Sequence, residues 1–265
     1  METIKTLLEI NLNYLVIVLI VIFFTLEQIL GNQFKFNKRL PHFFHNALLY
    51  LTLFSINFFW AGVIVFTIQW FNTNEIGLFY LIEIPFLAKL LLGVVLFDFS
   101  SYCFHRMAHK FNWVWRFHRV HHSDTSMDSS TFFRSHPFEL MFWFGASDML
   151  ASAIFGLDLM SNGLYFLILT PMLFFEHANF KYPKWLDKTI GLIITTPNLH
   201  KVHHDQDESF TNSNFADIFI LWDRIFGTFK YKPVEEIKLG LLEFDEPKKQ
   251  TFWYLLKSPF ISIKT

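Results

Sequence analysis

The sequence has a single cysteine, Cys103, among 265 residues. One thiol excludes an intramolecular disulfide and a cysteine-based zinc or iron–sulfur site. Charged residues are also scarce, at 17% of the chain against about 25% in an average soluble domain. The formal net charge is −1, so no strong overall field favours nucleic acid as a partner. The Glu-x-x-His motif of soluble di-iron bundles does not occur, so nitrogen has to dominate any metal site in this chain.

Apolar residues make up 52% of the chain, and 36 residues are phenylalanine. A helix needs roughly 20 mostly apolar residues to cross a bilayer. Five segments reach or approach this length: residues 10–30, 47–70, 77–104, 139–157 and 161–175. The first lacks a small-residue cleavage site, so we expect a retained membrane helix rather than a signal peptide. The last two predict a helical hairpin that either spans the bilayer or re-enters from one side. The sequence therefore predicts an all-α, polytopic membrane helical bundle of about four to five membrane helices, forming a single membrane domain over residues 1–265.

Lysine and arginine are unevenly distributed between the loops. Residues 31–46 contain three, residues 105–138 contain five and the tail from residue 177 contains twelve, whereas residues 71–76 and the hairpin tip contain none. Positively charged loops tend to stay on the cytoplasmic side, and all 12 histidines fall on the predicted inner side. We therefore expect a multi-pass integral membrane protein with a cytoplasmic histidine-rich cap. A bacterial cytoplasmic membrane is favoured, and in the endoplasmic reticulum the cap would face the same side.

Eight histidines form three short clusters. Residues three and four positions apart lie on one face of a helix, so we expect each cluster to direct its imidazoles at one point. Histidine is the commonest metal ligand, and a zinc site uses at most four ligands. Eight clustered histidines therefore predict two metal ions side by side. The clusters are His105-x3-His109, His118-x2-His121-His122 and His200-x2-His203-His204.

Two further histidines, His136 and His177, are candidate ligands. Each flanks an apolar run at the predicted inner membrane face, where an ionisable group without a partner is costly. His42 and His45 have no comparable spacing, and we do not expect them to bind metal. Imidazole suits iron, copper, nickel and zinc, so the spacing does not identify the metal.

Three carboxylates are candidates for orienting the imidazoles from outside the ligand set. Asp98 precedes His105 by two helical turns within an apolar run, so we expect it to pair with a histidine or an arginine. Glu176 directly precedes His177, and Asp205 directly follows His204.

Several shorter strings accompany the clusters in a fixed order. They are Asp98-x6-His105-Arg106, His121-His122-Ser123, Arg134-x-His136-Pro137-x-Glu139, His177-x-Asn179, Pro197-x2-His200 and Asp223-Arg224-Ile225-Phe226-Gly227-Thr228. With these strings, the chain resembles the membrane-bound fatty acid hydroxylase and sterol desaturase superfamily over residues 93–229. The order of the motifs is specific, whereas each motif alone is not.

The resemblance implies a di-iron centre within residues 93–229 that activates O2 to hydroxylate or desaturate a lipid, either sterol-like or fatty-acyl. Electrons would come from a separate redox partner and ultimately from NAD(P)H. The resemblance also implies that His136 and His177 belong to the histidine-rich site. We expect no catalytic residue beyond the metal ligands, and no appended haem-binding domain.

Two other functions stay open on the sequence alone. A histidine-rich metal-binding or transport protein would need ionisable groups along a path through the bilayer, whereas these histidines are predicted to gather on one face. A structural membrane protein would fold normally after all three clusters were altered. The sequence also leaves open which lipid is oxidised, whether the product is an alcohol or an alkene, which carrier donates electrons, and the oligomeric state.

Overall fold

A computed structural model of the chain describes residues 12–35 and 38–261, and these residues form helices and no β-strand. The predicted all-α class is confirmed. Four helices are long: α2 (Leu12–Leu30), α3 (Arg39–Thr73), α4 (Phe86–Lys110) and α7 (Leu159–His177). The shorter helices are α5 (Asn112–His122), α6 (Gly145–Phe155), α8 (Pro197–His203), α9 (Glu208–Thr211), α10 (Leu221–Ile225) and α11 (Phe252–Lys257). The start of the predicted helix over residues 10–30 lies outside the described residues.

Three of the long helices, α2, α4 and α7, are long and apolar enough to cross a membrane. The fourth candidate is a bent pair, Arg39–Ile56 and Phe58–Tyr80, whose halves meet at 51°. The predicted segment 139–157 differs, because α6 has only 11 residues and follows a π-helix at Glu139–Phe144. Of the two arms of the predicted hairpin, α7 alone therefore qualifies as a span.

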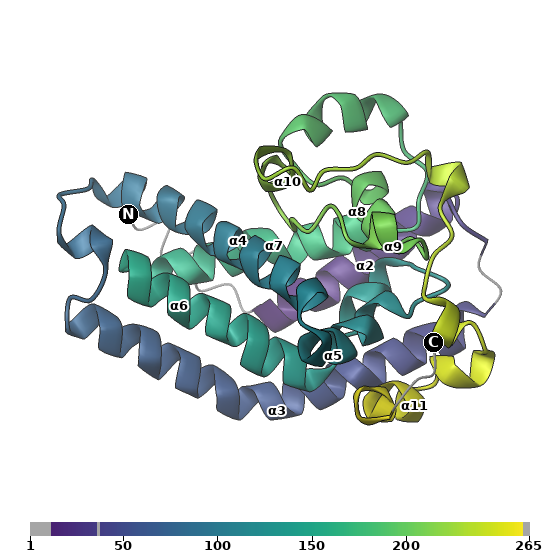
Figure 1. Cartoon of the computed structure of the whole chain (residues 1–265), viewed down its shortest axis with the longest axis horizontal. Helices are drawn as coiled ribbons and strands as arrows, with labels where there is room; N and C mark the ends of the chain where they lie inside the picture. The colour runs from purple at the N-terminus through teal and green to yellow at the C-terminus, as the bar shows by residue number, and fades with distance from the viewer. Residues whose placement is uncertain (1–11, 36–37, 262–265) are drawn as a thin grey trace.

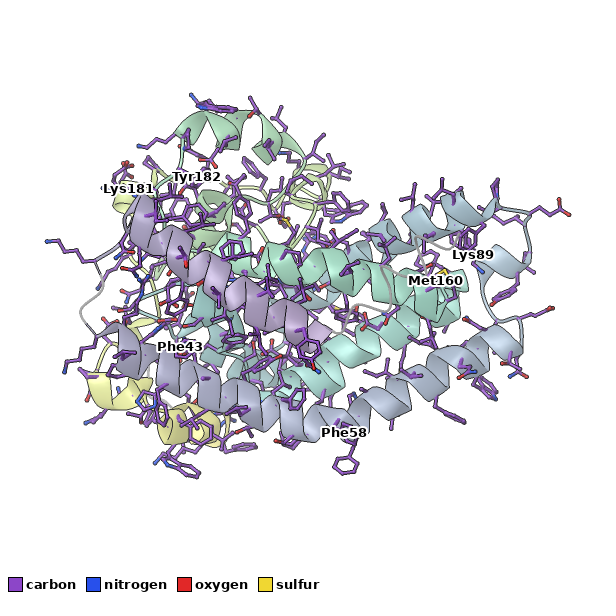
Figure 2. The ribbon with its side chains drawn as sticks, turned by 180° about the vertical axis from the view of Figure 1, so that it is seen from behind. Phe43, Phe58, Lys89, Met160, Lys181 and Tyr182 are labelled. Carbon is purple, nitrogen blue, oxygen red and sulfur yellow. The ribbon has the colours of Figure 1, made fainter. Side chains whose placement is uncertain are left out.

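The long helices form one elongated bundle, with the short helices α8 to α11 gathered at one end as a cap (Figure 1). α4 packs against both α6 and α7, and α3 packs against α6. Many large apolar side chains point outwards, as Phe58 does at 75% exposure (Figure 2). A surface so rich in exposed apolar residues is suited to lipid rather than water, as expected for an integral membrane protein.

Two glycines close the end of the bundle that is remote from the cap. Gly156 ends α6 in the left-handed conformation, with a φ of 72°, and allows the sharp turn into α7. Gly77, with a φ of 119°, lies against it so closely that a Cβ added there would lie 2.0 Å from the backbone nitrogen of Gly156. The histidine clusters lie at the opposite end, where α4 and α7 enter the cap.

Candidate metal centre

Four elements bring nine of the ten predicted ligands together. α4 ends with His105 and His109, α7 ends on His177, and α5 and α8 supply the other two clusters. Only His204 lies just outside its helix, directly after α8. The helical conformation predicted for the three clusters is therefore confirmed.

The nine histidines form two groups of nitrogen atoms, and within each group the atoms lie within 4.8 Å of one another. The first group is His105, His109, His118, His122 and His203, and the second is His121, His177, His200 and His204. The expectation that each cluster points at one place is wrong for α5 and α8. Positions i and i+4 serve one group and i+3 serves the other, because adjacent residues on a helix differ by about 100° in direction.

Facing ring nitrogens show that the groups fit metal ions. His105 Nδ1 lies 2.6 Å from the carbonyl oxygen of Phe215, and His203 Nδ1 lies 2.7 Å from that of Ser213. A carbonyl only accepts, so both Nδ1 atoms are donors, and each neutral ring keeps a lone pair on Nε2. These two Nε2 atoms are 3.0 Å apart, which is repulsive unless a cation lies between them.

The second group repeats this arrangement. His177 Nδ1 donates to the carbonyl of Leu173 at 2.7 Å, and His121 Nδ1 donates to that of Arg134 at 3.3 Å. Their Nε2 atoms face each other at 3.1 Å. Two nitrogen ligands at right angles on an ion with metal–nitrogen bonds of about 2.1 Å lie about 3 Å apart. The spacing in both groups therefore suits a bound metal ion.

A proton on one of these imidazoles would be a poor substitute for a metal cation between the facing nitrogens. Burial, together with the neighbouring imidazoles, holds the pKa of His122, His203 and His204 well below the ordinary value for histidine. These rings are therefore neutral near pH 7, which is the form that binds a metal.

The outer nitrogens of two rings in the first group have side-chain partners. Glu139, at the start of the π-helix, accepts a short hydrogen bond from His118 Nδ1. Asn212 Oδ1 lies 3.1 Å from His109 Nδ1. We did not predict either as an orienting residue. Glu139 belongs to the Arg134-x-His136-Pro137-x-Glu139 string and could have been found, whereas no sequence signal marks Asn212.

Glu176, a predicted orienting residue, lies between two rings of the second group. Its carboxylate oxygens are 3.6 Å from His177 Nδ1 and 3.5 Å from His200 Nδ1, and the side chain is fully buried. The structure thus brings Glu176 to the rings that the sequence indicated.

The other two carboxylates have different partners. Asp98 accepts from the backbone N–H groups of Ile218 and Phe219, both at 3.2 Å, and from the indole N–H of Trp222 at 2.8 Å. The prediction that it pairs with a histidine or an arginine is wrong, because the loop after α9 offers it two donors and Trp222 of α10 offers a third. Asp205 instead forms an ion pair of 2.6 Å with Lys232, and within the described part of the chain it makes no hydrogen bond to an imidazole.

The structure does not bring His136 to either nitrogen group. Its Nε2 donates to the carbonyl of Leu256 at 3.1 Å, and its Nδ1 accepts from the backbone N–H of Phe138 at 3.2 Å. Both nitrogens have backbone partners, so the expectation that His136 is a ligand is not met.

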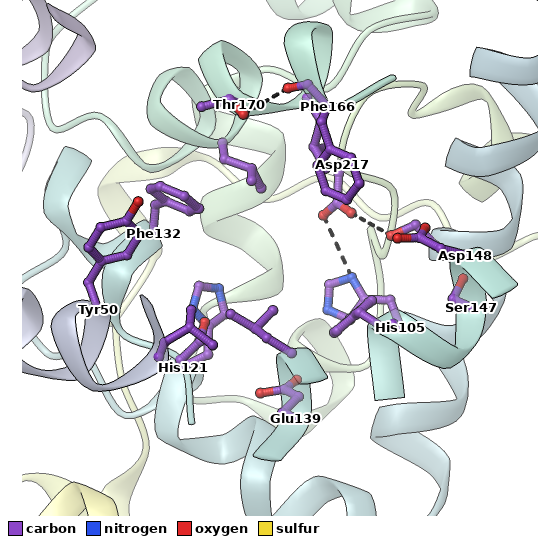
Figure 3. A pocket seen from close by; sticks show the side chains of 18 of the residues that line it. Tyr50, His105, His121, Phe132, Glu139, Ser147, Asp148, Phe166, Thr170 and Asp217 are labelled. Atoms are coloured by element: carbon purple, nitrogen blue, oxygen red, sulfur yellow. Dashed lines mark hydrogen bonds and ion pairs between the residues drawn. The ribbon is translucent and has the colours of Figure 1, made fainter. Parts of the chain in front are cut away.

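A cavity of about 390 Å³ is enclosed by histidines of the two nitrogen groups and by residues of the long helices. His105, His121 and Glu139 lie along one side of it, with Phe166 and Thr170 on the opposite side (Figure 3). Most of its lining is apolar and comes from α2, α3, α6 and α7. The arrangement places the candidate metal centre directly beside a space that suits a hydrocarbon.

Comparison with known proteins identifies a family that this chain matches. The family model described as fatty acid hydroxylase matches residues 90–228, just over half of the chain. The human alkylglycerol monooxygenase is 30% identical over 226 residues, which cover 82% of this chain and 44% of that enzyme. No solved structure matches the chain significantly.

Two other relatives match a smaller part of the chain. The ornithine lipid hydroxylase of Rhizobium tropici is 30% identical over 56% of this chain and 44% of its own length. The human cholesterol 25-hydroxylase is 30% identical over 54% of this chain and 52% of its own length. The chain thus spans about half the length, or less, of the curated relatives it matches.

Proposed function

Because the chain belongs to the fatty acid hydroxylase family, we propose that it is a membrane-bound di-iron oxygenase that hydroxylates or desaturates a lipid with O2. The observation that carries this proposal is the pair of facing nitrogen groups beside an apolar cavity. A cation between the facing lone pairs of His105 and His203, which lie 3.0 Å apart, would stabilise this contact. The oxidation of a hydrocarbon also needs a space beside the centre from which water is excluded.

The nine grouped histidines would hold the two irons, five at one site and four at the other. Glu139 would orient His118, and the Leu173 carbonyl would orient His177, because each accepts from the Nδ1 of that ring. A metal-bound histidine whose other nitrogen has a fixed partner is held in one tautomer and one orientation. Glu176 lies beside His177 and His200, 3.6 and 3.5 Å from their Nδ1 atoms, without a hydrogen bond to either ring.

Bound iron would supply the O2-dependent oxidation of an unactivated C–H bond, with electrons from a separate carrier that draws on NAD(P)H. The protein holds the hydrocarbon against the centre and excludes water from it. Phe132, Phe144 and Phe166 line the cavity and would serve this purpose.

Substrate would enter from the bilayer. Phe54 of α3 lines the cavity and is also 45% exposed on the outer surface of the bundle. Val16 of α2 lines the same cavity. Since α2, and α3 as part of the bent pair, are long and apolar enough to cross a membrane, an opening between them would admit a sterol-like or fatty-acyl lipid without passage through water.

Metal and lipid analysis test this function together. Protein purified from iron-supplemented cells under reducing conditions should contain about two irons per chain. Lipid mass spectrometry of cells with and without the gene should show one lipid class that gains an oxygen or loses two hydrogens. A single zinc with no iron would contradict the proposal.

A metal transporter is the alternative, and the placement of the histidines favours the enzyme. Both nitrogen groups lie at the cap end of the bundle, whereas a transport path requires ionisable groups along the whole crossing. Metal uptake into sealed vesicles would distinguish the two functions.

A further inference from the structure

One wall of the cavity is polar, although the oxidation of a hydrocarbon does not need it to be. Asp148 and Asp217 face the cavity there (Figure 3), beside the hydroxyl groups of Ser101 and Ser147. A buried carboxyl group without sufficient hydrogen-bond partners is costly. These side chains therefore indicate a ligand that brings polar hydrogens with it.

Asp148, in the first turn of α6, is only 9% exposed. Among the described residues, its carboxylate has no hydrogen bond of ordinary geometry, and the neighbouring Asn162 amide nitrogen is itself buried without a hydrogen-bond partner. A carboxylate has about four acceptor positions, and the Asn162 amide could fill at most two of them. Asp148 lines the cavity, so its remaining acceptor positions are available to a molecule bound there.

Asp217 connects this wall to the candidate metal centre. Its Oδ2 accepts a hydrogen bond from Ser101 Oγ at 2.9 Å. Its Oδ1 lies 3.9 Å from His105 Nδ1, which already donates to the Phe215 carbonyl. Oδ1 therefore also has room for a donor from the cavity, close to a ligand of the first metal group.

The charge of the lining narrows the ligand chemistry. Among the described residues, four carboxyl groups line the cavity, those of Glu139, Asp148, Glu176 and Asp217, and no lysine or arginine does. Two divalent metal cations in the adjacent nitrogen groups would offset up to four carboxylate charges, so the net charge of the site favours neither a carboxylate or phosphate group nor an ammonium group. A neutral hydroxyl group both donates and accepts, and so matches carboxyl groups placed beside serine hydroxyls.

We propose that Asp148 and Asp217 bind a neutral, hydroxyl-bearing group of the lipid, and that the cavity thereby selects alcohols and polyols over free fatty acids. This inference rests on the proposed function, because it takes the cavity as the substrate site. Asp148 and Asp217 are specificity-determining residues in this assignment and take no part in the oxidation itself.

Competition binding to the iron-loaded protein in detergent tests the inference. Tritiated hexadecane-1,2-diol is the probe, and the competitors are the unlabelled diol, its dimethoxy analogue, hexadecylamine and palmitate. Leaving a buried polar group without its hydrogen-bond partner costs enough to change affinity by about tenfold or more. The diol should therefore compete at least about tenfold better than the dimethoxy analogue. Asp148→Leu should reduce this preference severalfold, because only the contact with Asp217 then remains, and Asp148→Asn should retain more of it.

Asp158→Asn is the matched control, because Asp158 caps α7 at the remote end of the bundle and asparagine also caps helices. It should keep the full preference, and iron content reports the integrity of every variant. An equal affinity for the diol and its dimethoxy analogue in the unaltered protein would overturn the inference. So would stronger competition by palmitate or hexadecylamine, an unchanged preference in both Asp148 variants, or no binding of the diol. Binding is measured without O2 or reductant, so a protein that selects the diol but oxidises no lipid would contradict the proposed function alone.

Discussion

Adjacent histidines in this chain serve different metal groups. His121 and His122 are adjacent at the end of α5. His203, the last residue of α8, and His204, directly after it, are adjacent in the same way. In both cases the i, i+4 pair joins one group and the i+3 residue joins the other. The repeated His-x2-His-His spacing therefore lets each of two short helices bridge both groups, which fixes the separation of the two sites by helical geometry.

The two groups should differ in their sensitivity to the loss of a ligand. His204 is one of four in its group, whereas His109 is one of five and is the partly exposed member. We expect His204→Ala to lose metal to a chelator more than about tenfold faster than His109→Ala, since fewer ligands remain. Inductively coupled plasma mass spectrometry during chelator treatment measures this.

His45→Ala is the control for that experiment, since His45 accepts from the backbone N–H of Phe252 and belongs to neither group. It should retain the metal content of the unaltered protein. Equal loss rates for His204→Ala and His109→Ala would argue against an unequal division of the ligands.

Glu139 should affect metal binding through His118. Its carboxylate accepts from His118 Nδ1, and removal of such an orienting partner typically costs about 10- to 100-fold in metal affinity or activity. We expect Glu139→Gln to show a loss in this range, measured by competitive metal titration. Asp205→Asn should leave the affinity unchanged, because Asp205 pairs with Lys232. A large effect of Asp205→Asn would mean that Asp205 orients His204 after all.

At the scale of elements, the close approach of Gly77 and Gly156 should control the stability of the bundle. Alanine at position 77 adds a Cβ 2.0 Å from the Gly156 nitrogen, at a φ that L-residues rarely adopt. We expect Gly77→Ala to destabilise the fold by at least about 1–3 kcal/mol, seen as a lower melting temperature in detergent.

Gly62, in the middle of α3, is the matched control because nothing lies within 4 Å of an added Cβ. Gly62→Ala should leave stability unchanged or raise it by up to about 1 kcal/mol, through helix propensity. Equal destabilisation by both substitutions would show that the close contact at Gly77 makes no specific contribution to the stability of the fold.

The loop after α9 shows what the sequence could not reveal. Helical periodicity predicts that His118, His121 and His122 share a helix, because that relation is local. Of the two carboxylates that hold the loop, Asp223 is local and binds the backbone N–H groups of Phe215 and Ala216, both at 2.9 Å. Asp98 is remote in sequence, since it binds Ile218 across 120 residues. Asp98 thus helps to position the Phe215 carbonyl, and through it His105, across more than a hundred residues.

The difference between local relations and contacts that are remote in sequence also explains which site residues were predicted wrongly. His136 meets every local criterion for a ligand, yet its Nε2 is held by the Leu256 carbonyl from the C-terminal region. The cavity and its polar wall also depend on tertiary packing, since Asp148 and Asp217 come from different elements. Ligand types and helical spacing were predictable, whereas the division into two groups and the identity of most outer partners required the fold.

At the scale of the whole molecule, the charge distribution predicts on which side of the membrane the metal centre lies. Residues 71–76, which form the end of α3 and the turn after it, contain no lysine or arginine, whereas the tail from residue 177 contains twelve. These two regions lie at opposite ends of the bundle in Figure 1. The positive-inside rule then predicts that the cap lies in the cytoplasm and the turn outside.

Cysteine labelling tests this orientation in a Cys103→Ser background, which removes the natural thiol. Glu75, in the turn after α3, and Glu236, in the cap, are both exposed. A membrane-impermeant maleimide should label Glu75→Cys in intact cells, and should label Glu236→Cys only after permeabilisation. The opposite pattern would place the nitrogen groups outside the cell, where a cytoplasmic electron carrier could not reach them. The labelling result therefore bears on the electron supply as well as on the topology, because electrons drawn from NAD(P)H require a centre that faces the cytoplasm.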